Sequence, residues 1–313
     1  MRIAEATKPY PRLRRKGRYA DERALWIMLI PVVAYFVFFR YLPMAGVAIA
    51  LKKFSPFLGF SDSPWNGLEY FRQFFASIYF PRVLRNTLVI GAYYLLFAFP
   101  APVALALMLN SVASPPMKRT FQTITLLPHF VSFVVIAGLA VNMLSPRTGV
   151  VNLVIQALGG ESVFFMQKQE YFKGIYTAIR IFKETGYEAI VYLAALSAID
   201  PTLYEAAEVD GAGRMRKLVS ITLPSLIPTI VLMFLVRIGN IVSVSFEEVL
   251  LLQNDVILET SEVISTYVYR RGLIGADYSY ATAVGLFETV VALALVIGSN
   301  AIARRFRDAA SLW

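Results

Sequence analysis

Six ionisable residues lie inside otherwise apolar stretches, and their side-chain types could do chemistry there. A bare charge at the centre of a membrane helix costs about 2.5 to 3.5 kcal/mol, so such residues are kept as buried ion pairs or as a polar path. Three are basic and three acidic, which predicts internal pairing, and Arg180 and Glu184 have the i, i+4 spacing of a helical pair. Both readings, a path for a hydroxylated solute and ion pairs that fix helix register, stay open. The six are Arg180, Lys183, Glu184, Glu188, Arg237 and Glu288.

Several kinds of catalytic site are excluded by residue types that the sequence lacks. It contains no cysteine and one histidine, which excludes disulfides, thiolate nucleophiles, Cys-ligated metals and His-pair metal motifs. That histidine, His129, follows Pro128, a position more typical of packing than of a catalytic triad or a proton relay. No Gly-rich loop ending in Gly-Lys-Ser or Gly-Lys-Thr occurs, so the chain does not bind ATP through a Walker A loop. We therefore expect a chain that is not an enzyme and holds no metal or cofactor.

The composition is typical of a membrane protein. Of 313 residues, 57% are hydrophobic and 16% are charged, whereas charged residues make up about a quarter of soluble domains. Several apolar stretches reach the roughly 20 residues that cross a bilayer. We predict an all-α membrane protein with six transmembrane helices in one domain, 24–303. The expected spans are 24–42, 83–109, 121–144, 171–199, 223–244 and 278–303.

The distribution of charge predicts the topology. Residues 1–23 form a basic arm, and the segments that share its side of the membrane are shorter and richer in Lys and Arg than the others. By the positive-inside rule, both termini are cytoplasmic. The net charge of +9 is therefore explained by topology, with some contact to anionic lipid, rather than by nucleic-acid binding. This arrangement makes 43–82, 145–170 and 245–277 external loops and places 200–222 and the tail 304–313 in the cytoplasm.

The cytoplasmic loop 200–222 is the most informative segment. Pro201 can begin a helix, Gly211 and Gly213 can end it, and a basic group leads back to the membrane. Small residues at 206 and 207 would let another surface approach closely, and the acidic side chains could bind a partner's Arg or Lys. On these grounds alone, docking to a soluble protein and an ordinary surface loop are equally supported.

The spacing of the loop residues resembles the EAA loop of permease subunits of binding-protein-dependent ABC importers. Residues Glu205, Ala206, Ala207, Gly211, Ile221, Leu223 and Pro224 carry the pattern. Other segments are similar to permeases of the polysaccharide and complex-oligosaccharide uptake group, in particular the first permease subunit of bacterial alginate importers. They are 41–46, 65–68, 246–249, 266–270, 280–287 and 312–313.

The resemblance implies the type I ABC importer permease fold and a pore subunit of the bacterial inner membrane. It implies a second permease, two copies of a cytoplasmic ATPase that holds ATP and Mg²⁺, an external solute-binding protein and a saccharide, with an alginate-like acidic saccharide favoured. The ATPase-contacting residues would be Glu205, Ala206, Ala207, Asp210 and Gly211, with Leu223 and Pro224 where the chain re-enters the bilayer. Substrate-path candidates are Lys183, Tyr187, Glu188, Tyr192, Asn240, Ser243 and Glu247.

Three alternatives to this function remain. An ABC permease for small sugars or other solutes would share the loop motif. A proton- or ion-coupled secondary carrier could use Lys183, Glu184, Glu188 and Glu288 as a relay. A membrane scaffold that transports nothing would show no substrate-dependent ATPase activity in a reconstituted complex.

Overall fold

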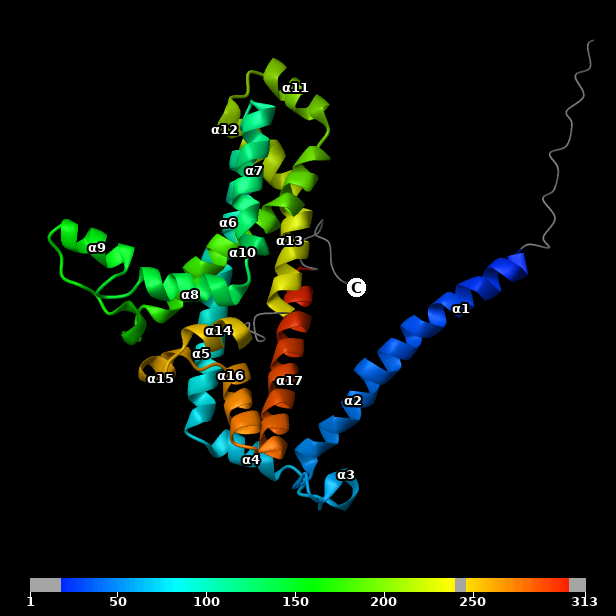
Figure 1. Ribbon diagram of the computed structural model, residues 1–313. Helices are drawn as coiled ribbons and strands as arrows, with labels where there is room; N and C mark the ends of the chain where they lie inside the picture. Colours follow the sequence, from blue (N-terminus) through cyan, green and yellow to red (C-terminus); the bar gives the residue numbers. More distant parts are fainter. Residues whose placement is uncertain (1–17, 240–245, 304–313) are drawn as a thin grey trace, which may run out of the picture. The chain divides into compact units, whose positions relative to one another are not determined.

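The protein is described by a computed structural model that covers residues 18–239 and 246–303, and every regular element in these ranges is helical (Figure 1). The chain divides into two units, Met1–Ile49 and Ala50–Trp313. The elements in chain order are α1 (Arg18–Phe36), η1 (Val37–Tyr41), α2 (Leu42–Met44), η2 (Ala45–Leu51), α3 (Gly59–Asp62), α4 (Glu69–Ala76), α5 (Tyr79–Tyr93), η3 (Tyr94–Ala98), α6 (Pro100–Asn110), α7 (Pro115–Phe130), α8 (Phe133–Met143), α9 (Val150–Ala157), η4 (Phe165–Gln167), α10 (Phe172–Ser197), α11 (Pro201–Val209), α12 (Arg214–Lys217), η5 (Leu218–Thr222), α13 (Leu223–Gly239), α14 (Phe246–Leu252), η6 (Asp255–Ile257), α15 (Leu258–Ser261), α16 (Ile264–Tyr269), η7 (Arg270–Ile274) and α17 (Tyr278–Ala303).

Four helical segments among the described residues are long and apolar enough to cross a membrane, and they coincide with four of the six predicted spans. A fifth predicted span, 171–199, corresponds to α10, which is about 39 Å long by its 26 residues but carries several charges. Length and apolarity therefore do not confirm six spans. The four segments are Leu25–Leu51, Tyr79–Asn110, Arg214–Ile238 and Tyr278–Ala301.

The span predicted over 121–144 is not one continuous helix. Two helices, α7 and α8, replace it and meet at an angle of 97°. The cause is local, because Val131 and Ser132 both have extended backbone angles, which end α7 and begin α8 in a new direction. This segment counts as at most one span, and only if the bent pair is taken together.

Three prolines of the long helical segments follow π-helical turns, whereas Pro31, Pro128 and Pro228 lie inside α-helices. The first helix continues to Leu51, past the end predicted at residue 42, although Pro43 lies within it. A proline lacks the N–H that a regular helix requires and its ring crowds the carbonyl four residues earlier, whereas a π turn shifts the hydrogen bonds by one residue. The turns η1, η3 and η5 each end two residues before a proline, respectively Pro43, Pro100 and Pro224.

Helix α10 is the centre of the second unit and packs against α5, α6, α7 and α13. One buried cluster joins its first half to α8 and α14, and another joins its second half to α6 and α13. Tyr176 and Tyr192 are almost fully buried on it. A separate aromatic cluster around Phe74 and Tyr267 joins α4, α5, α16 and α17. The charged face of α10 is therefore held inside a helix bundle.

Candidate functional site

Helix α11 is stopped at both ends by interactions that its own sequence supplies. At the start, the Asp200 side chain accepts a hydrogen bond from the Thr202 N–H at 2.9 Å, and Pro201 takes the first helical position. This hydrogen bond lowers the pKa of the Asp200 carboxyl. At the end, Gly211 has φ of +73°. Its N–H donates to the Glu208 carbonyl, and the next N–H donates to the Ala207 carbonyl at 2.8 Å, which is the Schellman arrangement.

Two side-chain contacts tie α11 to the helix that returns to the membrane. Lys217 Nζ donates to Glu208 Oε2 at 2.8 Å, and this contact lowers the pKa of the Glu208 carboxyl. The hydroxyls of Tyr204 and Thr222 are 2.9 Å apart. Since Thr222 ends the π turn η5 next to α13, this contact joins α11 to the start of α13. In Figure 1, α11 and α12 lie together at one end of the second unit.

The predicted coupling residues lie on or beside the exposed side of α11. Glu205, Ala206, Asp210 and Gly211 are exposed, and Ala207 is half-buried. Apolar side chains accompany them, since Leu203 and Val209 are 49% and 89% exposed. Leu223, half-buried, and Pro224, exposed, open α13. Their place at the point of re-entry into the bilayer stays a prediction. The helix therefore offers a mixed acidic and apolar surface.

Five of the six charges of the apolar helices form ion pairs. The ion pairs of the described residues include neither one of Glu288 on α17, whose Oε1 is buried there without a hydrogen-bond partner, nor the predicted Arg180–Glu184 pair. Arg180 Nη1 instead lies 2.5 Å from Glu248 Oε2 on α14. Glu188 on α10 pairs with Arg237 on α13. Glu184 lies 3.2 Å from His129 Nδ1 and 3.9 Å from Lys183 Nζ. Arg180 and Glu188 pair with residues of other helices rather than of their own helix, because each charge is buried against a neighbouring helix.

His129, Lys183 and Tyr187 form a polar cluster where α7 ends. The rings of His129 and Tyr187 are stacked with centroids 4.0 Å apart and planes 4° apart. Lys183 Nζ donates to the His129 carbonyl at 2.8 Å, close to the break between α7 and α8. Tyr187 remains 49% exposed. Of the predicted path residues, Lys183 and Tyr187 are thus brought together.

The other path candidates lie elsewhere. Glu188 and Tyr192 are 4% and 1% exposed and are buried among the chain's own helices, so neither borders an open surface in this structure. Glu247 is exposed at the start of α14. Asn240 and Ser243 lie outside the described residues.

Two buried acids were not recognised from the sequence. Glu248 is the partner of Arg180, and the only available signal was a pair of adjacent acids, with Glu247, before an apolar run. Glu262 is 1% exposed and binds both Arg82 and Arg270. Arg180 and Arg82 are 68 and 180 residues from these acids in the sequence, and Arg270, eight residues from Glu262, is beyond the i, i+4 spacing of a helical pair, so no helical spacing predicts these contacts.

The sequence matches one protein family and two of its relatives from Bacillus subtilis. Residues 98–309 match the family described as "Binding-protein-dependent transport system inner membrane component". Protein LplB of Bacillus subtilis (strain 168) is 44% identical over 91% of this chain and 90% of its own length. The polygalacturonan/rhamnogalacturonan transport system permease protein YteP of the same strain is 39% identical over 98% and 99%.

Solved structures agree with the sequence comparison. A chain from the crystal structure of a bacterial ABC transporter involved in the import of the acidic polysaccharide alginate matches with a TM-score of 0.86 and 44% identity, covering 92% of this chain and 98% of that one. A chain from the bacterial alginate ABC transporter in complex with an alginate pentasaccharide-bound periplasmic protein matches with a TM-score of 0.86 and 42% identity, covering 95% and 99%. The predicted type I ABC permease fold is confirmed by these likenesses, apart from the number of spans.

Proposed function

The chain belongs to the family of binding-protein-dependent transport system inner membrane components, and from this we propose that it is one half of the pore of an ATP-driven importer of acidic saccharides. The observation that carries the proposal is α11, a capped and exposed helix with the EAA-loop residues, linked by side chains to the membrane helix that follows it. Because we expect this chain neither to hold ATP nor to catalyse its hydrolysis, it needs a contact through which the ATPase subunit can move the pore. We call α11 with its two contacts to Lys217 and Thr222 the joint.

The relatives and the charged helix α10 support the proposed substrate class. The similar permease YteP is named for polygalacturonan and rhamnogalacturonan, and the similar crystal structure for alginate. All three are uronate-containing, so each sugar repeat can carry a carboxylate as well as hydroxyls. Lys183 and the half-exposed Tyr187 offer an ammonium group and an aromatic face to such a substrate.

The remaining path candidates have different roles within this proposal. Glu188 and Tyr192 are buried and would support the shape of the path from behind. Glu247 is exposed and would meet substrate near the outer end, together with Asn240 and Ser243. A permease for small sugars or other solutes would need the same joint but not a path suited to carboxylates.

The mechanism is alternating access. ATP and Mg²⁺ bind to a pair of cytoplasmic ATPase subunits, whose closure moves α11. The contacts of Tyr204 with Thr222 and of Glu208 with Lys217 pass that movement to α13, and the pore opens outward to receive saccharide from a binding protein. A second, similar permease supplies the other half of the pore. Both termini and the loop 200–222 then lie in the cytoplasm.

A reconstituted importer tests the joint. Changing Glu205→Lys or Gly211→Val should abolish saccharide uptake and uncouple it from ATP hydrolysis, while the binding protein still captures saccharide. The matched control is Glu161→Lys, which makes the same charge change at an exposed acid of the predicted external loop 145–170 and should leave coupling intact. Normal uptake by both joint variants would refute the proposal.

The secondary-carrier alternative is tested separately. If the proton gradient is collapsed with a protonophore while internal ATP is maintained, an ABC importer continues to transport. A proton-coupled carrier would stop. If uptake stops under this treatment, the ATP-driven importer is refuted and the proton-coupled carrier takes its place.

A further inference from the structure

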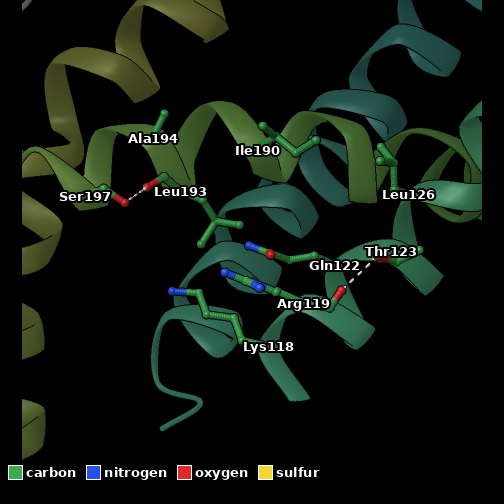
Figure 2. A pocket seen from close by; sticks show the side chains of 9 residues that line it. All are labelled: Lys118, Arg119, Gln122, Thr123, Leu126, Ile190, Leu193, Ala194 and Ser197. Atoms are coloured by element: carbon green, nitrogen blue, oxygen red, sulfur yellow. Dashed lines mark hydrogen bonds between the residues drawn. The ribbon is translucent and has the colours of Figure 1, made fainter. Parts of the chain in front are cut away.

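A pocket lies between the first half of α7 and the last turns of α10, and the proposed function gives it no role. Its volume is about 570 Å³. From α7 it is lined by Lys118, Arg119 and Gln122, whose nitrogen-bearing ends point to the same side in Figure 2. From α10 it is lined by Leu193 and Ser197, among others. Basic side chains thus stand over a partly apolar wall.

The pocket continues the polar cluster along both helices. On α10, the pocket residues Ile190, Ala194 and Ser197 follow Lys183 and Tyr187 at spacings of four, three, four and three residues, which keeps all five on one helix face. Ten residues separate Tyr187 from Ser197, so the stripe extends about 15 Å beyond the stacked ring.

A row of residues on one face of α7 lies at the same helical spacing as the row on α10. Lys118, Gln122 and Leu126 lead by steps of four, four and three residues to His129, the ring that stacks on Tyr187. The two helices pack against each other. The pocket reaches Leu126 and Ile190, each three residues from the stacked rings of His129 and Tyr187. Its basic end is the cytoplasmic end in the predicted topology.

The chemistry of the pocket suits an acidic sugar. Within the described residues, neither Lys118 nor Arg119 forms an ion pair, so both cations are available to a carboxylate. The hydroxyls of Thr123 and Ser197 donate to their own helix at the Arg119 and Leu193 carbonyls, which leaves their oxygens to accept hydrogen bonds from sugar hydroxyls (Figure 2). Apolar residues of the wall can cover the C–H face of a sugar ring.

We infer that this pocket is an inner subsite for an acidic saccharide, where Lys118 and Arg119 hold a uronate carboxylate of the substrate on its way to the cytoplasm. The inference rests on the proposed function, since it takes the pocket as the inner part of the path. It adds a second contact for the substrate, about 15 Å along α10 from Tyr187.

The absence of cysteine from the chain allows a direct test. In inside-out vesicles that contain the whole importer, Ser197→Cys provides one thiol of this chain in the pocket. Oligogalacturonate should slow its labelling by an anionic methanethiosulfonate several-fold. The matched control is Ser111→Cys, at the C-terminal end of α6, where the serine is also exposed and also donates to its own helix but does not line the pocket.

The two cations are then tested in the Ser197→Cys background. Lys118→Gln with Arg119→Gln should abolish protection by oligogalacturonate, whereas Lys118→Arg with Arg119→Lys keeps both charges and should preserve it. Protection that survives the loss of both charges, or equal protection at Ser111→Cys, would overturn the inference. So would labelling that responds to added phosphatidylglycerol but not to oligogalacturonate, because the pocket would then be a lipid site.

Uptake by the unmodified importer separates the two proposals. If intact cells do not take up oligogalacturonate through this importer, the proposed acidic-saccharide function fails. If uptake occurs but Ser197→Cys is not protected, only the inner subsite is overturned.

Discussion

Gly186 lies where α10 contacts α7, and Gly186→Ala should disturb the proposed substrate path more than the other substitutions considered below. A Cβ added to Gly186 would lie 1.9 Å from the Thr125 carbonyl oxygen and 2.9 Å from the Leu126 nitrogen. Both atoms belong to the backbone of α7, so no flexible side chain can move aside. Because carbon and oxygen rarely approach within about 3.3 Å even in weak hydrogen bonds, Gly186→Ala requires the helices to separate by roughly 1.4 Å.

Such a separation would disrupt the polar cluster next to the contact. Lys183 Nζ lies 2.8 Å from the His129 carbonyl, and a further 1.4 Å or so would exceed hydrogen-bonding distance. The stack of His129 on Tyr187, at 4.0 Å, would also open. Overpacking of this kind costs about 1–3 kcal/mol. We expect the melting temperature to fall by several degrees, at about 2–4 °C per kcal/mol.

The assay compares thermal unfolding and saccharide uptake of the purified, reconstituted importer. Gly174→Ala is the matched control, because it makes the same substitution on the same helix where nothing lies within 4 Å of the added Cβ. It should leave stability unchanged or raise it slightly, since alanine favours helix by up to about 1 kcal/mol over glycine. Equal melting temperatures and uptake for Gly186→Ala and the unmodified chain would refute the reasoning.

Three other perturbations test the joint and the buried charges. Gly211→Ala places a Cβ at a φ of +73° and should cost about 1–2 kcal/mol of local stability, whereas Gly213→Ala, at φ of −70°, should not; faster amide exchange in α11 for the first variant alone is the expected result. Glu248→Gln removes the carboxylate that pairs with Arg180, and breaking such a buried pair should cost about 3–5 kcal/mol, seen as a lower melting temperature; an unchanged value would contradict the pairing. Because Lys217 lowers the pKa of Glu208 in the folded protein, this contact stabilises α11 at pH values above the glutamate's ordinary 4.5, and the effect is lost as the pH falls through the lowered value; the protection of α11 amides against exchange should fall in acid, and Lys217→Gln should weaken that dependence to the part that the Asp200 cap supplies.

The sequence predicts features that depend on neighbouring residues. Asp200, Pro201 and Gly211 stand at the ends of a short helix, and the structure places them in the cap, the first turn and the left-handed terminal position. Four of the apolar stretches become helices of membrane-spanning length. These features follow from local propensity, capping and hydropathy, which act over one or two helical turns.

Local signals failed where the outcome depended on a distant segment. The pairing of Arg180 with Glu248 rather than Glu184 joins helices 68 residues apart in sequence, and it depends on which side of α10 faces α14. The bend after α7 and the continuation of the first helix past Pro43 needed backbone geometry that composition does not reveal.

By itself, then, the sequence determined that the chain crosses a membrane and carries a capped loop helix at a spacing typical of ABC permeases, because these properties reside in consecutive residues. Only the tertiary structure decided which charges are paired, why residue 186 must be glycine and that α7 and α10 enclose a basic pocket. Those depend on how closely two helices approach and which faces they turn to each other. That is set by the packing of the whole bundle.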